Sequence, residues 1–159
     1  MKDNVLINIG EAYCVINMIS GPLLEDQDLR DILDDHKHNM IHLPSDFDEN
    51  NDYDDGRQRL KFKIFGGPSA GEVYYFRPTD EIIVVGRTPE CEIRINDKLL
   101  SKCQAHLQYV AEDDQWVMCD GLHSKPSTNG TWLYIKDDHP ISSGMVFKAN
   151  QTIFTAQLI

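Results

Sequence analysis

Three short stretches in the second half of the chain carry side chains that could bind a phosphate group. Arg87 follows a glycine, Lys102 follows Ser101, and Thr128 and Asn129 stand before another glycine. A guanidinium and an ammonium supply positive charge, while serine and threonine hydroxyls add hydrogen-bond donors. Phosphate oxygens accept strong, charge-assisted hydrogen bonds from such groups. These residue types therefore favour a binding site for a phosphorylated ligand.

The three stretches lie between segments whose pattern predicts short β-strands. From Leu60 onwards apolar and polar residues alternate with period two, and glycine- or proline-containing turns separate the alternating runs. The predicted strands cover residues 60–64, 73–76, 82–85, 93–95, 105–110, 116–119, 132–135, 145–148 and 153–158. Many short strands at nearly regular spacing predict a mainly β fold, a β-sandwich of antiparallel or mixed strands.

The order of the motifs resembles that of the forkhead-associated (FHA) domain, a family of modules that bind phosphothreonine peptides. The matching stretches are Gly86-Arg87, Ser101-Lys102, Trp116 to Gly121, and Ser127-Thr128-Asn129-Gly130-Thr131. Each stretch alone is a weak signal, but four in this order, three of them on predicted loops, are specific. The resemblance covers residues 60–159 and implies an FHA-type β-sandwich there.

The resemblance also implies roles for individual residues. The phosphate would be bound by Arg87, Ser101, Lys102 and Thr128, and the peptide backbone beside the phosphothreonine by Asn129. The loops would be shaped by Gly86, Gln104, Gly130 and Thr131. Family members usually carry histidine where this chain has Gln104, and the loop at residues 122–126 is longer than usual.

The first 59 residues differ in charge from the rest of the chain. They contain 14 acidic and 5 basic residues, whereas residues 60–159 contain 12 and 10. Blocks of like charge repel one another and bury little surface. We therefore expect an N-terminal extension over residues 1–43 and an acidic linker over residues 44–59, followed by the sandwich domain.

Two segments of the predicted extension have a pattern of their own. In Val5–Ile19 the apolar residues fit one face of a helix, but Val5–Ile9 alone fits a strand, and the sequence does not separate the two. Glu25–Asp35 predicts a short helix, because acidic residues in its first turn suit the helix dipole and its apolar residues form one stripe.

Composition argues against several classes of partner. The net charge of −11 disfavours nucleic acids and anionic membrane surfaces. No run approaches the roughly 18 apolar residues of a membrane helix, and no signal peptide is recognisable. The four cysteines stand singly, so we expect reduced thiols in an intracellular protein, cytoplasmic or nuclear.

Other chemistry was weighed against this hypothesis. Gly67–Gly71 matches the Gly-x-Ser-x-Gly of a hydrolase, but a strand-like segment follows it where a helix is required. His36, His38 and His42 lack the spacing of a zinc site. We therefore expect no catalytic residues, no metal and no cofactor. The remaining alternative is a protein-interaction module of the same fold that works without phosphate; the oligomeric state stays open.

Overall fold

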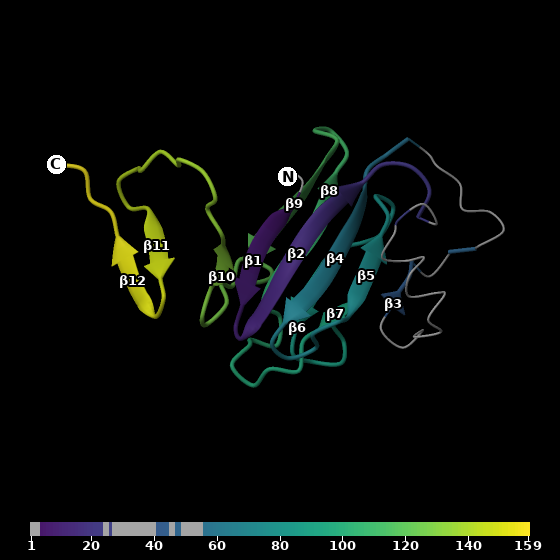
Figure 1. Ribbon diagram of the computed structural model, residues 1–159, viewed down its shortest axis with the longest axis horizontal. Coiled ribbons are helices and arrows are strands. Elements are labelled where there is room, and N and C mark those ends of the chain that lie inside the picture. Colours follow the sequence, from purple (N-terminus) through teal and green to yellow (C-terminus); the bar gives the residue numbers. More distant parts are fainter. Residues whose placement is uncertain (1–3, 24–25, 27–40, 45–46, 49–55) are drawn as a thin grey trace.

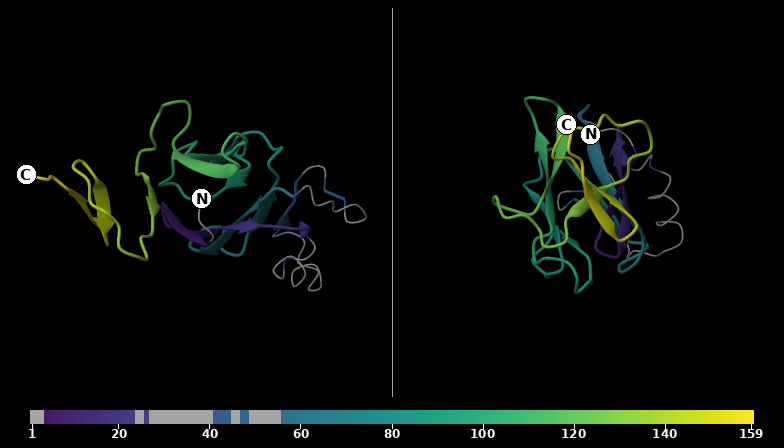
Figure 2. Two further views of the ribbon diagram at one scale, coloured as in Figure 1. Left: turned by 90° about the horizontal axis from the view of Figure 1, so that it is seen from above. Right: turned by 90° about the vertical axis from the view of Figure 1, so that its left-hand side faces the viewer.

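The computed structural model describes residues 4–23, 26, 41–44, 47–48 and 56–159 of the chain. Apart from Asp26, the helix predicted over Glu25–Asp35 lies outside the described residues, and so does most of the linker predicted over residues 44–59. The described part is mainly β, as predicted, and its strands form two stacked sheets and a separate hairpin (Figures 1 and 2).

The two sheets are mixed. In spatial order, the larger contains β10 (Thr131–Leu133), β1 (Val5–Ile9), β2 (Ala12–Ile19), β4 (Arg59–Gly66), β5 (Val73–Phe76) and β3 (Ile41–His42). The smaller contains β7 (Ile93–Arg94), β6 (Ile83–Gly86), β8 (Ala105–Val110) and β9 (Gln115–Asp120). The separate hairpin contains β11 (Val146–Ala149) and β12 (Thr152–Thr155). Neighbouring strands are antiparallel except the parallel pairs β3–β5 and β6–β7.

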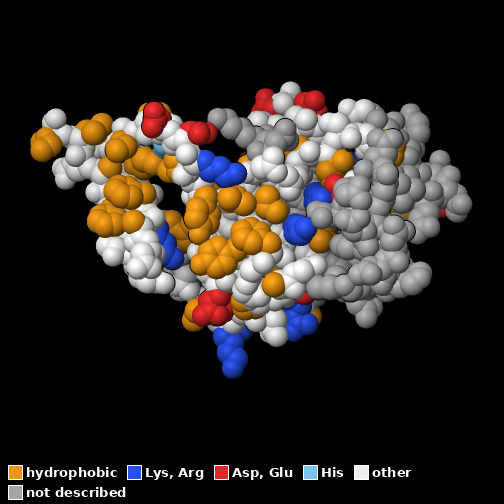
Figure 3. All heavy atoms as spheres, viewed as in Figure 1, with side chains coloured by type: hydrophobic (Ala, Val, Ile, Leu, Met, Phe, Trp, Pro, Cys, Tyr) orange, Lys and Arg blue, Asp and Glu red, His pale blue; other side chains and the backbone are white. Residues whose placement is uncertain are grey.

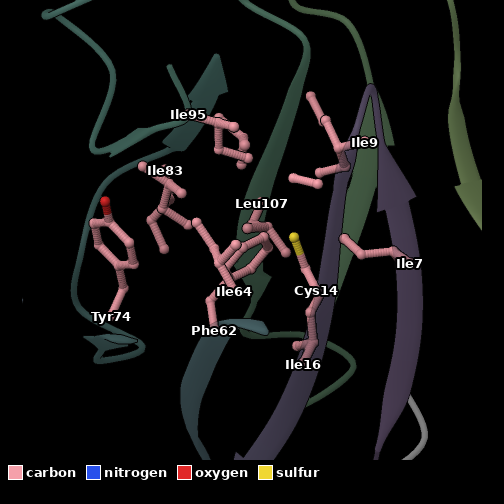
Figure 4. Close-up of a cluster of buried hydrophobic side chains, with 14 of the residues drawn as sticks. Ile7, Ile9, Cys14, Ile16, Phe62, Ile64, Tyr74, Ile83, Ile95 and Leu107 are labelled. Carbon is pink, nitrogen blue, oxygen red and sulfur yellow. The ribbon is translucent and has the colours of Figure 1, made fainter. Parts of the chain in front are cut away.

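The core lies between the two sheets, where the inward residues of both meet (Figure 4). Strand alternation puts every second side chain on the inner face. From the larger sheet Ile7, Cys14 and Phe62 point toward Ile83 and Leu107 of the smaller sheet, and all five are buried. Trp116 also belongs to this core and is 2% exposed.

The apolar segment Val5–Ile19 forms a β-hairpin, so the helical alternative is wrong. A two-residue turn, Gly10-Glu11, joins β1 to β2, and Gly10 has φ +58°, a conformation that glycine adopts without strain. The hairpin lies inside the larger sheet, because β1 pairs with β10 and β2 pairs with β4. The division of the chain into extension, linker and domain stays a prediction, although this hairpin belongs to the same sheet as β4.

A small second cluster covers the outer face of β4 and β5. Leu23 and Tyr75 are fully buried there. The Lys61 ammonium lies 2.7 Å from a carboxylate oxygen of Asp26, and the Tyr75 hydroxyl donates a hydrogen bond to the same oxygen at 2.9 Å. The charges are paired, which offsets the cost of burying them.

The structure also tests whether Gly67–Gly71 is the nucleophile turn of a hydrolase. The segment turns the chain from β4 into the antiparallel β5, which is a hairpin and not the strand-to-helix elbow of a hydrolase. His36 and His38 lie outside the described residues, and the described ones contain no group of three or more metal-ligating side chains. Within the same ranges no helix is long and apolar enough to span a membrane.

Candidate phosphopeptide-binding site

The predicted site residues lie on the loops that follow β6, precede β8 and precede β10. Arg87 comes directly after β6, and its backbone N–H donates to the carbonyl of Ser101 at 3.3 Å. Ser101 lies four residues before β8, which pairs with β6. The ladder between the two strands therefore fixes both loops at the same edge of the smaller sheet.

The structure brings the two predicted hydroxyl groups together. The Ser101 hydroxyl donates to Thr128 Oγ1 at 3.3 Å, and the Thr128 backbone N–H donates to Ser101 Oγ at 3.0 Å. Thr128 is exposed and Ser101 is partly exposed. Two loops that are 27 residues apart in sequence thus present their hydroxyls to the same patch of solvent.

The side chain of Gln104 holds these two loops in place through hydrogen bonds. Its side chain is fully buried, and Oε1 accepts the backbone N–H of Ser101 at 3.0 Å. Nε2 donates to Ser127 Oγ at 2.8 Å and to the carbonyl of Gly130 at 3.0 Å. An amide can do both because it carries donors and an acceptor. Gln104 therefore connects the loop before β8 with the loop before β10.

Ser127 and Asp120 belong to the same network, although the sequence analysis did not select them. Ser127 Oγ accepts the backbone N–H of Gly130 at 2.9 Å and donates to Asp120 Oδ1 at 2.7 Å. The Thr131 hydroxyl donates to that same carboxylate oxygen at 2.9 Å. The sequence contained a signal for this network. Asp120 ends β9 and Ser127 stands directly before Thr-Asn-Gly, and such residues often form hydrogen bonds that stabilise a turn.

The Asn129 side chain is anchored at the base of the loop. Its Nδ2 donates to the carbonyl of Leu99 at 2.8 Å, and its own backbone carbonyl accepts the indole N–H of Trp132 at 3.0 Å. Trp132 is only partly buried, unlike Trp116, which belongs to the core. Asn129 remains exposed, and its amide oxygen is available to a ligand.

Arg87 and Lys102 are exposed cations. In the described part of the chain neither side chain forms an ion pair or a hydrogen bond with another residue. The Thr88 hydroxyl lowers the pKa of the nearby Glu90 carboxyl, and Lys102 contributes a smaller attraction. Desolvation raises the pKa of the Cys103 thiol, which keeps this neighbour of Lys102 neutral. Among the described residues the site therefore carries two exposed cations whose side chains have no ion-pair or hydrogen-bond partner.

Gly86 allows the loops to approach one another. A Cβ at this position would lie 2.0 Å from the Lys102 carbonyl oxygen and 2.9 Å from Cys91 Sγ. We expect Gly86→Ala to lower the free energy of unfolding by about 1–3 kcal/mol, since a backbone carbonyl must move to admit the methyl group. Urea unfolding measures this. Gly66→Ala is the matched control, because there the nearest atom, 3.3 Å away, belongs to the partly exposed Tyr13 side chain; equal losses in both variants would contradict the argument.

The long loop at residues 122–126 closes on itself. Leu122 and Lys125 exchange two backbone hydrogen bonds of 3.0 Å, and both residues between them, His123 and Ser124, have positive φ. This is the geometry of a tight type I′ turn. The additional residues therefore form a small projection that returns the chain to Ser127 without displacing it.

Asp97, a further residue that the sequence analysis missed, connects the site to the β1–β2 hairpin. Its buried carboxylate accepts the backbone N–H of Glu11 at 2.9 Å through Oδ2 and that of Leu99 at 2.8 Å through Oδ1. Leu99 is the residue whose carbonyl holds Asn129. Nothing local in the sequence signals this link, since Glu11 and Asp97 are 86 residues apart.

Comparison with known proteins gives one match. Residues 83–153 match the family model described as the FHA domain, from the first residue of β6 to the second residue of β12. The match includes all nine predicted site residues and leaves β1 to β5 outside. Searches of the curated proteins and of the solved structures found no match. By its motifs, its β-sandwich and this family match, residues 83–153 of the chain are similar to the FHA domain, a family of phosphothreonine-binding, protein-interaction modules.

Proposed function

We propose that this chain binds phosphothreonine-containing proteins through the loops around Ser101 and Thr128, and that it acts in signalling or scaffolding without catalysing a reaction. The observation that carries the proposal is the contact of the Ser101 and Thr128 hydroxyls, braced by the buried Gln104. A phosphate needs convergent donors on a rigid frame, because donors fixed beforehand lose little entropy on binding.

The charges around the hydroxyls support an anionic ligand. The backbone N–H of Arg87 donates a hydrogen bond to the carbonyl of Ser101, and Lys102 follows Ser101 directly in the sequence. Both cations are exposed, and a dianionic phosphate would supply the partner that the described part of the chain does not give them. In a protein of net charge −11 such a local pair of cations is selective for a ligand with concentrated negative charge.

Asn129 adds a contact for the peptide itself. Its Nδ2 is held by Leu99, which fixes the orientation of the amide and leaves the oxygen free to accept an N–H from the ligand backbone. Gln104 stands where other members of the family usually carry histidine, and its hydrogen bonds hold the loops in this chain. Because all three of its side-chain hydrogen bonds are made, the loops do not need the histidine.

Three peptides that differ only at one residue test the proposal. We expect the phosphothreonine peptide to bind, the phosphoserine peptide to bind about 10–200-fold more weakly, and the unphosphorylated threonine peptide not to bind measurably. A missing methyl group in a fitted apolar pocket accounts for the difference between the first two. Isothermal titration calorimetry measures all three dissociation constants.

The alternative, a protein-interaction module independent of phosphate, makes a different prediction for the same peptides. Equal affinities for the phosphorylated and unphosphorylated forms would support the alternative and overturn the proposal. A library of phosphothreonine peptides with randomised flanks supplies the peptide sequence, because the flanking residues would contact the loops around the site.

A further inference from the structure

The C-terminal hairpin leaves large apolar side chains in solvent. It lies beyond β10, at one end of the molecule, and apolar side chains gather over it (Figures 1 and 3). Phe147 is 38% exposed and Phe154 is 43% exposed, and their rings stack with centroids 5.1 Å apart. In the described part of the chain β11 and β12 pair only with each other. A contiguous apolar surface of this kind usually has a partner.

The C-terminal hairpin has the same plan as the β1–β2 hairpin. Each has a two-residue turn, Gly10-Glu11 or Asn150-Gln151, whose first residue has positive φ. Counted from these turns the cross-strand pairs agree: Ile9–Ala12 with Ala149–Thr152, Ile7–Cys14 with Phe147–Phe154, and Leu6–Val15 with Val146–Thr155. Two segments at opposite ends of the chain therefore form hairpins with the same turn length and the same cross-strand pairing.

The inward faces also correspond. On the β1–β2 hairpin they are Ile7, Ile9, Ala12, Cys14 and Ile16, which are at most 3% exposed. At the same register positions the C-terminal hairpin has Phe147, Ala149, Thr152, Phe154 and Ala156. Two large rings and three small residues replace three isoleucines and two small residues. Cores accept such replacements when the total volume and the alternation are kept.

The connectivity permits the C-terminal hairpin to take the same place. Leu133, at the end of β10, pairs with Ile7, and the Tyr134 N–H donates to the carbonyl of Leu6 at 2.9 Å. If β11 took the place of β1, it would have to begin beside Leu133 and Tyr134. Residues 134–145 connect β10 to β11, and an antiparallel neighbour requires only that the chain reverse direction.

We propose that the position between β10 and β4, called the hairpin slot here, accepts either hairpin, so that β11–β12 exchanges with β1–β2 within one chain. The exchange buries Phe147 and Phe154 and releases Cys14 and Ile16 to solvent. It is a proposal about the fold and does not depend on the ligand of the site.

One contact favours the described arrangement. A Cβ at Gly10 would lie 2.3 Å from Asp97 Oδ2 and 2.8 Å from Leu100 Cδ2. Asn150 carries a Cβ at the matching turn position, so the exchanged hairpin must displace the loop at residues 96–100. That loop contains the Leu99 carbonyl that holds Asn129. The exchange thus reaches the edge of the candidate site.

The first test traps each arrangement with a disulfide in the full-length chain. Val15 pairs with Lys63, and Thr155 is the register equivalent of Val15. The double variant Val15→Cys/Lys63→Cys reports the described arrangement, and Thr155→Cys/Lys63→Cys reports the exchanged one. Peptide mapping by mass spectrometry identifies the linked residues, so the native cysteines remain. We expect both disulfides within single chains, and we expect Phe154→Asp to abolish the second one, because it places a charge in the core.

The second test uses two native thiols and needs no new cysteine. Cys14 is fully buried and the reagent cannot reach it, and this burial also raises its pKa to about 12, so iodoacetamide alkylates Cys14 only after the hairpin leaves the slot. Cys91 is buried in the loop between β6 and β7, outside the hairpin slot, and serves as the reference thiol. We expect Cys14 to react faster than Cys91. We expect Asn150→Gly to raise the Cys14 rate about fivefold, because it removes the Cβ overlap with Asp97; Phe154→Asp should lower it.

The outcomes separate the possibilities. Equal rates for Cys14 and Cys91 in all variants would mean that the slot opens only when the whole domain unfolds, and would overturn the proposal. A Thr155→Cys/Lys63→Cys disulfide that joins two chains would overturn exchange within one chain in favour of a swapped dimer. If this variant forms no disulfide while the Val15→Cys/Lys63→Cys variant does, the proposal also fails. If neither disulfide forms, the alkylation rates decide.

Discussion

Arg87→Ala is expected to abolish phosphothreonine peptide binding while the domain stays folded. Removing one partner of a close charge pair costs about 2–5 kcal/mol in binding free energy, which is a loss of about thirtyfold or more. The exposed guanidinium forms no ion pair or hydrogen bond within the described residues, so the free energy of unfolding should change by less than about 0.5 kcal/mol. Calorimetric titration and urea unfolding measure the two quantities.

Lys136→Ala is the matched control for this prediction. It removes one positive charge too, but Lys136 Nζ contacts the Asn4 carbonyl at 3.4 Å, beside the start of β1 and away from the Gly10 turn that reaches Asp97. We expect its affinity to equal that of the wild type. Arg87→Lys should fall between the two, because an ammonium keeps the charge but lacks the two-pronged guanidinium geometry. Wild-type affinity in Arg87→Ala would reject the assigned site.

Gln104→Ala is expected to destabilise the domain by about 2–4 kcal/mol, since each buried polar group left without a partner costs about 1–3 kcal/mol. The variant leaves the Ser101 N–H and the Gly130 carbonyl without the Gln104 amide, and it removes a donor from Ser127. Because these bonds hold the two hydroxyl-bearing loops together, peptide affinity should fall as well. Urea unfolding measures the first effect and titration the second.

Gln108→Ala, a substitution of the glutamine within β8, controls for the loss of a glutamine near this strand. Gln108 is partly exposed, so a change below about 0.5 kcal/mol is expected. Gln104→His should recover part of the stability, because an imidazole supplies one donor and one acceptor. If Gln104→Ala is as stable as Gln108→Ala, the buried amide does not brace the loops.

The link from Glu11 through Asp97 to Leu99 gives the N-terminal hairpin a place in the function. The hairpin completes the larger sheet, and its turn meets the loop whose carbonyl orients Asn129. A segment outside the family match therefore helps to position residues inside it. Exchange of the two hairpins would alter this contact first, since Asn150 cannot occupy the place of Gly10 without moving Asp97.

Much of the fold could be predicted because its strands are encoded locally. The period-two alternation from Leu60 onward predicted the strands of the smaller sheet, and the order of four motifs indicated the FHA family, which the family match bears out. Local pattern also indicated that Gly67–Gly71 is a turn. It failed for Val5–Ile19, where helical spacing and strand alternation fit the same apolar residues and only the partner strands decide.

What sequence alone determined is therefore the class of fold and the residue types at the rim of the sandwich. The tertiary structure decided which of them meet: Ser101 with Thr128 across 27 residues, Gln104 with Gly130 across 26, and Asp97 with Glu11 across 86. It also decided which hairpin fills the position between β10 and β4. The local pattern predicts strands in both hairpins. Which of them pairs with β10 and β4 depends on how well each one packs against the core, and a local sequence pattern does not show this.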